Sequence, residues 1–142
     1  MNKRVIYVRQ DEPDKLGVLI PMNCGLTVEE IANKDLPSGT LFAIVNKEEV
    51  PVDFDFMDAW EFNEGNTAVV VNLNKAKEIA HEVRRRARVV EMAPLDIKST
   101  IPSEAAAAEE ARVAIRAKYE GVQTSIDAAA DVDALKAIVE GL

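Results

Sequence analysis

The chain has 142 residues, of which 48% are hydrophobic and 5% aromatic, and its formal net charge at pH 7 is −8. This length is enough for one domain, or for a small domain with a helical extension, and its core needs no covalent cross-links. The negative charge argues against a general nucleic-acid binder, because phosphates would be repelled. The single cysteine, Cys24, excludes an intramolecular disulfide framework and a C-x-x-C metal site.

We expect no signal peptide at the beginning of the chain. Charged residues occur too early in MNKRVIYVRQDEP for the apolar core of a signal peptide. No run in the sequence approaches the roughly 20 apolar residues that a membrane-spanning helix needs. We therefore expect a protein that is made and kept in a cytoplasm and has no membrane partner.

Charge and composition divide the chain near residue 72. Residues 1–72 contain 6 Lys and Arg against 13 Asp and Glu, whereas residues 73–142 contain 11 against 12. The second part is also rich in alanine, which favours helix. We predict an α+β protein: residues 1–72 form a small, mostly antiparallel β domain with a short helix, and residues 73–142 form a helical arm or a helical hairpin.

The first part is predicted to hold about four short strands. Alternating or β-branched apolar residues place them at residues 3–9, 16–20, 40–45 and 67–71. A polar turn at residues 11–14 joins the first two strands as a hairpin. Thr27 and Glu30 have the spacing of a capping box, which predicts a short helix through about Asn33.

Aromatic residues are concentrated at residues 53–62, DFDFMDAWEF, which we expect to be irregular. Our preferred interpretation is that the rings fill the open face of a small sheet that has too few strands to close its own core. The alternative is an aromatic contact patch for a partner, in which Trp60 would be a partner-binding residue.

Residues 73–92 form the most strongly patterned predicted helix. Apolar residues recur at a spacing of three and four, with Ile79 beside them: Leu73, Ala76, Ala80, Val83, Ala87 and Val90. This stripe faces a partner helix or a sheet. Pro94 is predicted to end the helix, so residues 93–102 are expected to be a connector.

The same helix carries the block RRRAR, residues 84–88. We favour a face that is solvated or pairs with acidic groups over a nucleic-acid site, because the arginines point in several directions and no aromatic side chains are interleaved. His81 has no second histidine or cysteine near it in the sequence and is expected to be a packing or surface residue.

Two more helices are predicted after the connector. The first begins near Ser103, and its stripe of Ala108, Ala111, Ile115 and Tyr119 continues past Gly121. The pattern leaves open whether the helix continues through Gly121 or restarts after it. Asp131 is a good N-cap for a short helix over residues 132–140.

Sequence motifs of the common enzyme classes are missing. The chain lacks G-x-G-x-x-G, a Walker-type G-K-[ST], H-E-x-x-H and G-x-S-x-G. The segment DFDFMD lacks the glycine and the final glutamate of a calcium-binding loop. We therefore predict a protein that is not an enzyme, with no catalytic, cofactor-binding or metal-binding residues and no cofactor.

Three segments together resemble a family of small tailed-bacteriophage proteins encoded in the tail and tail-fibre gene region. The resemblance covers roughly residues 40–142. The matching residues are Ile44, Val45, Asn46, Val50 and Pro51, then Phe56, Asp58, Ala59, Trp60 and Glu61, and then Lys75, Ala76, Lys77, Glu78 and Ile79. The later segments APLD, IRAKY and DALKAI are similar to the helical tail of such proteins.

The resemblance implies a chaperone-like assembly protein that binds a phage tail or tail-fibre protein in the host bacterial cytoplasm. An alternative is a structural component that stays in the virion tail or fibres, and a nucleic-acid-associated role is a third, weaker one. The contact residues would be Ile79, Val83, Val90, Ile115 and Tyr119, with Arg84, Arg85 and Arg88 attracting an acidic partner. Alternatively, the stripe only joins the two long helices, or it mediates a homo-oligomer.

Overall fold

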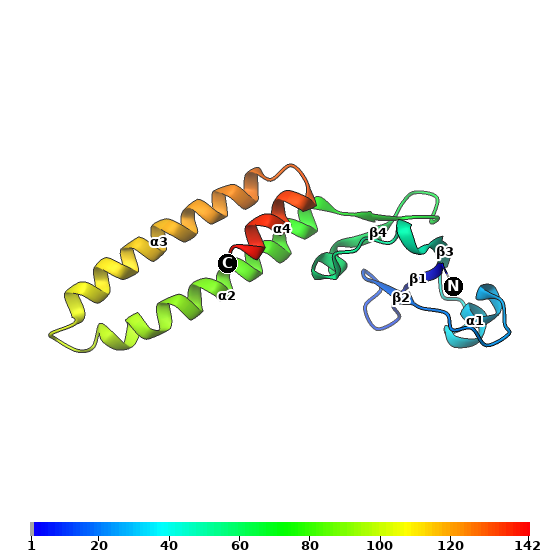
Figure 1. The fold of residues 1–142 in the computed structure, drawn as a ribbon, viewed down its shortest axis with the longest axis horizontal. Coiled ribbons are helices and arrows are strands. Elements are labelled where there is room, and N and C mark those ends of the chain that lie inside the picture. The colour runs from blue at the N-terminus through cyan, green and yellow to red at the C-terminus, as the bar shows by residue number, and fades with distance from the viewer. Residues whose placement is uncertain (1) are drawn as a thin grey trace. The chain divides into compact units, whose positions relative to one another are not determined.

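The computed structural model describes residues 2–142, and the chain divides into two compact units, Met1–Asn72 and Leu73–Leu142. We call them the strand unit and the helical unit. The α+β class is confirmed, because antiparallel strands come first and helices follow (Figure 1).

The strand unit is built on a sheet in which β1 (Lys3–Val8) lies between β2 (Leu16–Leu19) and β3 (Phe42–Asn46). Both pairings are antiparallel, and the predicted hairpin of the first two strands is confirmed. Successive residues of a strand point to opposite faces of its sheet. Val5 and Ile6 are both fully buried, so both faces of the central strand are covered.

The helix α1 (Val28–Asp35) has the predicted capping box and packs near β1. Thr27 Oγ1 accepts a hydrogen bond from the Glu30 backbone N–H at 3.2 Å, and Glu30 Oε2 accepts one from the Thr27 N–H at 2.7 Å. Ile31 and Ala32 are the buried residues of this helix. These two bonds satisfy backbone donors that a helix start would otherwise leave without partners.

A second, two-stranded sheet consists of β4 (Trp60–Phe62) and β5 (Val69–Val71). The prediction of about four strands missed β4, which lies in the segment that we expected to be irregular. A strand of three residues has almost no pattern of its own and exists through its pairing with β5. Short 3-10 turns, η1 (Lys47–Glu49) and η2 (Phe54–Ala59), precede it.

The core of the strand unit gathers side chains from both sheets and the turns between them. Val8, Val18, Met57 and Phe62 pack against it as partly buried residues. Its buried members are Ile6, Leu16, Ala43, Val45, Val50 and Trp60.

The helical unit contains α2 (Leu73–Lys98), α3 (Ala105–Ala128) and α4 (Val132–Glu140). The prediction that Pro94 ends the first helix is wrong, because α2 continues for four residues beyond it. Proline removes one backbone donor, and the carbonyl it leaves without a partner, four residues earlier, belongs to Val90. The side chains of Val90 and Pro94 are both exposed, so this side of α2 faces water, which can hydrate the free carbonyl.

The third and fourth predicted helices are present. α3 runs without a break through Gly121, and its N-cap is Glu104 rather than Ser103. The helix over residues 132–140 is confirmed, and Asp131 caps it by accepting a hydrogen bond from the Ala134 N–H at 2.8 Å. The connector between α2 and α3 is therefore only residues 99–104.

The two long helices form an antiparallel hairpin, and α4 folds back against both of them (Figure 1). At 1.5 Å per residue, α2 and α3 are about 39 and 36 Å long, whereas α4 is only about 14 Å long. α4 follows the end of α3 directly, so it can cover only the end of the hairpin that is far from the connector. We call the other end the connector-side half.

Candidate protein-binding surface

The hairpin is held together by polar pairs along its contact as well as by apolar packing. Each pair joins a residue of α2 to one of α3, in the order expected for antiparallel helices. The distances are 2.8 Å from His81 Nε2 to Asp127 Oδ1, 2.6 Å from Arg84 Nη1 to Gln123 Oε1, 2.6 Å from Lys118 Nζ to Glu91 Oε1, and 3.2 Å from Arg112 Nη2 to Asp96 Oδ1.

Tyr119 belongs to the interior of this hairpin. Its ring is 1% exposed, and its hydroxyl donates a hydrogen bond to Glu91 Oε1 at 2.6 Å. The hydrogen bond from Lys118, followed by that from Tyr119, lowers the pKa of Glu91. Burial, followed by the neighbouring Glu91, raises the pKa of Tyr119. The structure thus gives Tyr119 a packing role and no free surface for a partner.

His81 is also a packing residue, as predicted. It is 8% exposed and contacts Asp127 across the hairpin. In the part of the chain that the structure describes, no group of three or more His, Cys, Asp or Glu side chains could hold a metal ion.

Trp60 lies in the core of the strand unit, with 1% of its surface exposed. Phe56 is buried as well, which supports the interpretation that the aromatic rings fill the open face of the sheet. Phe54 lies at the edge of this cluster, with its ring centroid 5.4 Å from that of Trp60 and its side chain exposed. A partner therefore has no access to Trp60 while this core is intact.

The apolar stripe of α2 is covered along only part of its length. Ala76 and Ala80 are fully buried, whereas Ile79 and Val83 are half-buried, as is Ile115 on α3. Val90, further along the same stripe, is 72% exposed. The stripe therefore joins the helices of this chain at one end and is uncovered at the other.

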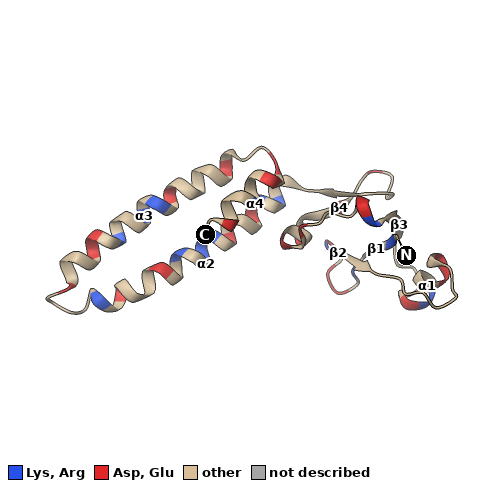
Figure 2. Cartoon of the chain, in the orientation of Figure 1, with Lys and Arg blue, Asp and Glu red and all other residues tan. Residues whose placement is uncertain are grey.

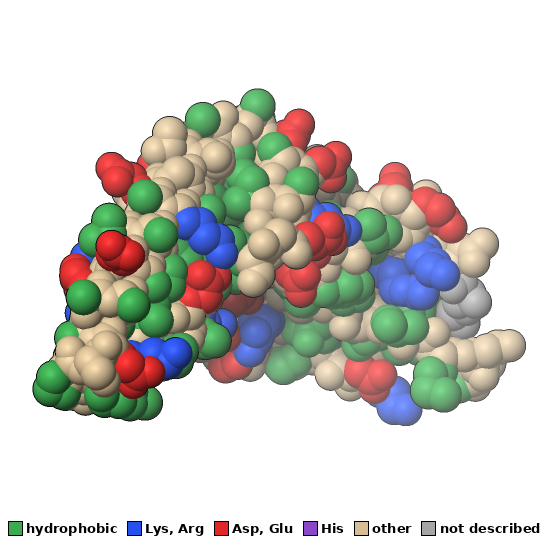
Figure 3. Space-filling model, turned by 60° about the vertical axis from the view of Figure 1, so that its left-hand side comes forward, with side chains coloured by type: hydrophobic (Ala, Val, Ile, Leu, Met, Phe, Trp, Pro, Cys, Tyr) green, Lys and Arg blue, Asp and Glu red, His purple; other side chains and the backbone are tan. Residues whose placement is uncertain are grey.

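Large aliphatic side chains are exposed on the connector-side half of the hairpin. Val89 is 67% exposed, Ile97 69% and Val113 54%. In Figure 3, hydrophobic side chains gather at the lower left, over the connector end of the helical unit. Single exposed apolar residues are ordinary, but several along one helix pair are typical of a surface that binds another protein.

The arginines of the RRRAR block point in different directions, as expected. Arg84 contacts Gln123 across the hairpin, and Arg85 pairs with Glu82 one turn earlier. Arg86 and Arg88 are exposed, and neither forms an ion pair with any residue in the described range 2–142.

Arg85 and Arg88 line a groove between α2 and α3 with a volume of about 480 Å³. We call it the basic groove. Its arginines are Arg85 and Arg88 of α2 and Arg112 and Arg116 of α3, and its apolar lining is Val89, Met92 and Ala93. Because a helix turns by about 100° per residue, these α2 residues lie on a different face from Val90 and Ile97. The predicted contact residues thus form two separate surfaces.

Carboxylates neutralise only part of the charge in the basic groove. Arg112 pairs with Asp96 at 3.2 Å and with Glu109 at 3.3 Å, and Arg116 pairs with the other oxygen of Glu109 at 2.9 Å. The hydrogen bond from Arg116 lowers the pKa of Glu109. Figure 2 shows that both long helices carry residues of both signs.

Arg112 and Arg116 were not predicted as members of this groove. They are four residues apart on α3 and therefore share one face. This spacing was visible in EEARVAIRAK. Which residues of α2 they would meet depends on the register of the hairpin, and no local pattern fixes that register.

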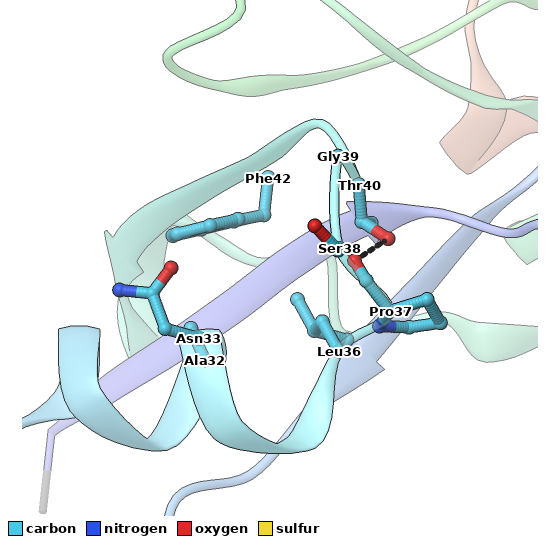
Figure 4. Close-up of a pocket in the computed structure, with 8 residues that line it drawn as sticks. All are labelled: Ala32, Asn33, Leu36, Pro37, Ser38, Gly39, Thr40 and Phe42. Atoms are coloured by element: carbon cyan, nitrogen blue, oxygen red, sulfur yellow. Dashed lines mark hydrogen bonds between the residues drawn. The ribbon is translucent and has the colours of Figure 1, made fainter.

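A smaller hollow of about 180 Å³ lies at the end of α1 (Figure 4). Leu36, Pro37 and Phe42 are among its lining residues, and the Thr40 hydroxyl donates a hydrogen bond to the Pro37 carbonyl at 2.7 Å. None of its eight lining residues is an acid, a base or a thiol, so no lining side chain could activate the Ser38 or Thr40 hydroxyl as a nucleophile.

Among residues 2–142, no helix has the length and apolar character needed to cross a membrane. Comparisons of the chain with protein-family models, with curated proteins and with solved structures gave no match.

Proposed function

We propose that this chain is a non-enzymatic assembly protein of a bacteriophage tail or tail fibre. In this proposal it acts like a chaperone in the host bacterial cytoplasm and binds a tail component through the connector-side half of its helical hairpin. The observation that carries the proposal is that, among residues 2–142, no third helix packs on this half, which exposes Val89, Val90 and Ile97.

The helical unit leaves this half free for a partner because α4 is too short to reach it. A helix pair buries a continuous apolar stripe only where a third element packs on it, and α4 is long enough for one end alone. Leaving large aliphatic side chains in water has a free-energy cost that association with another protein removes. The hairpin therefore has the form of a binding arm.

The assignment to a phage tail is supported by the residue pattern at positions 40–142. The segments around Ile44, Trp60 and Lys75 resemble those of small proteins from the tail and tail-fibre gene region. Geometry supports the binding role, and the resemblance supports the kind of partner.

The experiment is co-expression of the chain with each protein encoded beside it, followed by purification through a tag on this chain. The proposal predicts that a tail or tail-fibre protein co-purifies and that Ile97→Asp weakens the complex. Co-purification with none of these proteins would overturn the proposal.

Protein composition of purified particles then separates the chaperone from a component that stays in the virion. A chaperone is absent from finished particles. A structural component is present at a fixed stoichiometry.

A further inference from the structure

We infer that the basic groove binds an acidic amphipathic helix of the partner. This inference deepens the proposed function and rests on it only for the identity of the protein that supplies the helix. The groove itself is formed by α2 and α3 alone.

The shape of the groove fits a helix. Two long antiparallel helices leave a trough along their contact, and a third helix laid in such a trough packs with side chains at i, i+3, i+4 and i+7. The chain already uses this mode of packing, because α4 folds against the same two helices at the other end of the hairpin. In α4, Leu135 is fully buried and Val139 is half-buried, whereas Asp133 and Glu140 are exposed.

The lining of the groove fits apolar anchors. Val89 is 67% exposed, Met92 is half-buried, and both line the groove together with the four arginines. Methionine adapts its shape to different side chains, so it suits a surface that receives Leu, Ile or Met from a partner. A partner helix would remove this apolar surface from water. A nucleic-acid backbone would place hydrated phosphate groups beside it and would not bury it.

The charge of the groove fits carboxylates. Four arginines line it, and Asp96 and Glu109 neutralise only the two from α3. Arg85 forms an ion pair with Glu82, and Arg88 has no ion-pair partner within residues 2–142. The groove is therefore a local positive site on a chain whose net charge is −8. Glutamates that flank the apolar anchors of a partner helix would pair with Arg85 and Arg88.

The test uses the full chain and a fluorescein-labelled peptide of about 18 residues, or five helical turns. Leucines occupy one face of the peptide, and glutamates flank them. A twin peptide has glutamine in place of every glutamate, and a single-stranded and a duplex DNA of similar length are the nucleic-acid probes. Binding is measured by fluorescence anisotropy at two salt concentrations.

We expect the glutamate peptide to bind about tenfold more tightly than its glutamine twin, and this advantage to shrink at high salt. Arg88→Glu should weaken binding of the glutamate peptide about tenfold, because it replaces an attraction by a repulsion. Arg86→Glu is the matched control, since it makes the same change on the same helix outside the groove, and it should change affinity less than about twofold. Circular dichroism checks that both variants keep the fold.

Equal affinity for the two peptides, or equal losses in the two variants, would overturn the inference. Tighter binding of either DNA than of the glutamate peptide would also overturn it, in favour of a nucleic-acid role. Failure of the peptide while a tail protein still co-purifies rejects the groove and leaves the proposed function intact. Peptide binding without any tail protein in the co-expression experiment rejects the proposed function and leaves the groove.

Discussion

Replacing Leu135 by alanine tests whether α4 is held on the hairpin by side-chain burial. Leu135 is fully buried, and the other residues of α4 are half-buried or exposed. A helix of nine residues is not stable by itself in water. α4 therefore depends on its contacts with α2 and α3. Among the residues of α4, Leu135 buries its side chain most completely.

The expected loss follows from the burial of this side chain. Truncation of a fully buried leucine to alanine removes its transfer free energy and leaves a cavity, at a cost of about 2–5 kcal/mol. A value near the middle, about 3 kcal/mol, corresponds to a change of about a hundredfold in the equilibrium between docked and detached α4. Because α4 lies at one end of the hairpin, we expect local detachment before global unfolding.

Hydrogen exchange read by mass spectrometry separates these two outcomes. In Leu135→Ala, the amides of residues 132–140 should exchange about a hundredfold faster, while those in the connector-side half of α2 and α3 keep their protection. Ile97→Ala is the matched control, because Ile97 is 69% exposed and its truncation should cost less than about 0.5 kcal/mol.

Two results would contradict this prediction. Unchanged protection of residues 132–140 in Leu135→Ala would show that burial of this leucine does not hold α4. A loss in Ile97→Ala as large as that in Leu135→Ala would show that the connector-side half is covered, for example by a second copy of the chain.

Three further predictions concern the hairpin. Pro94→Ala should raise the free energy of unfolding by about 1–3 kcal/mol, because it restores a helical hydrogen bond at an exposed position; a lower melting temperature would contradict this. Gly121→Ala should raise it by about 0.5–1 kcal/mol in denaturant titrations, since an added Cβ meets no atom within 4 Å; a loss would mean that α3 is packed at this point. For Glu91 the folded-state pKa is lower than the ordinary value of 4.5, so its contribution to stability is complete above that value and is lost as pH falls through the lower folded-state pKa. As the pH falls from about 5 to below this folded-state pKa, the free energy of unfolding should therefore decrease less in Glu91→Gln than in the parent chain. Urea titrations at several pH values measure this difference. An equal decrease in both proteins would assign the acid sensitivity to other carboxylates.

Features that depend on a few neighbouring residues were predictable from the sequence. Thr27 and Asp131 begin helices because their side chains accept hydrogen bonds from backbone N–H groups three residues later. The hairpin of β1 and β2 was also predictable, because its polar turn and the alternation of apolar and polar residues in its strands are local features of the sequence. These elements are specified by interactions that span a few residues.

Features decided by contacts between distant segments were not predictable. Pro94 is tolerated inside α2 because Glu91 and Asp96, on either side of it, both contact α3. β4 exists because it pairs with β5, although its own three residues carry no clear pattern. In both cases the tertiary interaction outweighs the local preference.

The candidate site shows the same division. The periodicity of Ala76, Ala80 and Val90 correctly indicated an apolar stripe. It could not indicate that α4 leaves Val90 uncovered, because this depends on the length and docking of α4. The basic groove needs the register of the hairpin, which brings Arg112 and Arg116 beside Arg85 and Arg88.

The most direct test of a partner-binding hairpin is co-purification of a neighbouring tail or tail-fibre protein with the parent chain, Arg88→Glu and Arg86→Glu. We expect the parent chain and Arg86→Glu to retain this protein in similar amounts and Arg88→Glu to lose most of it. Equal retention by both variants would contradict binding through the basic groove. Failure of the parent chain to retain any such protein would contradict the role in tail assembly.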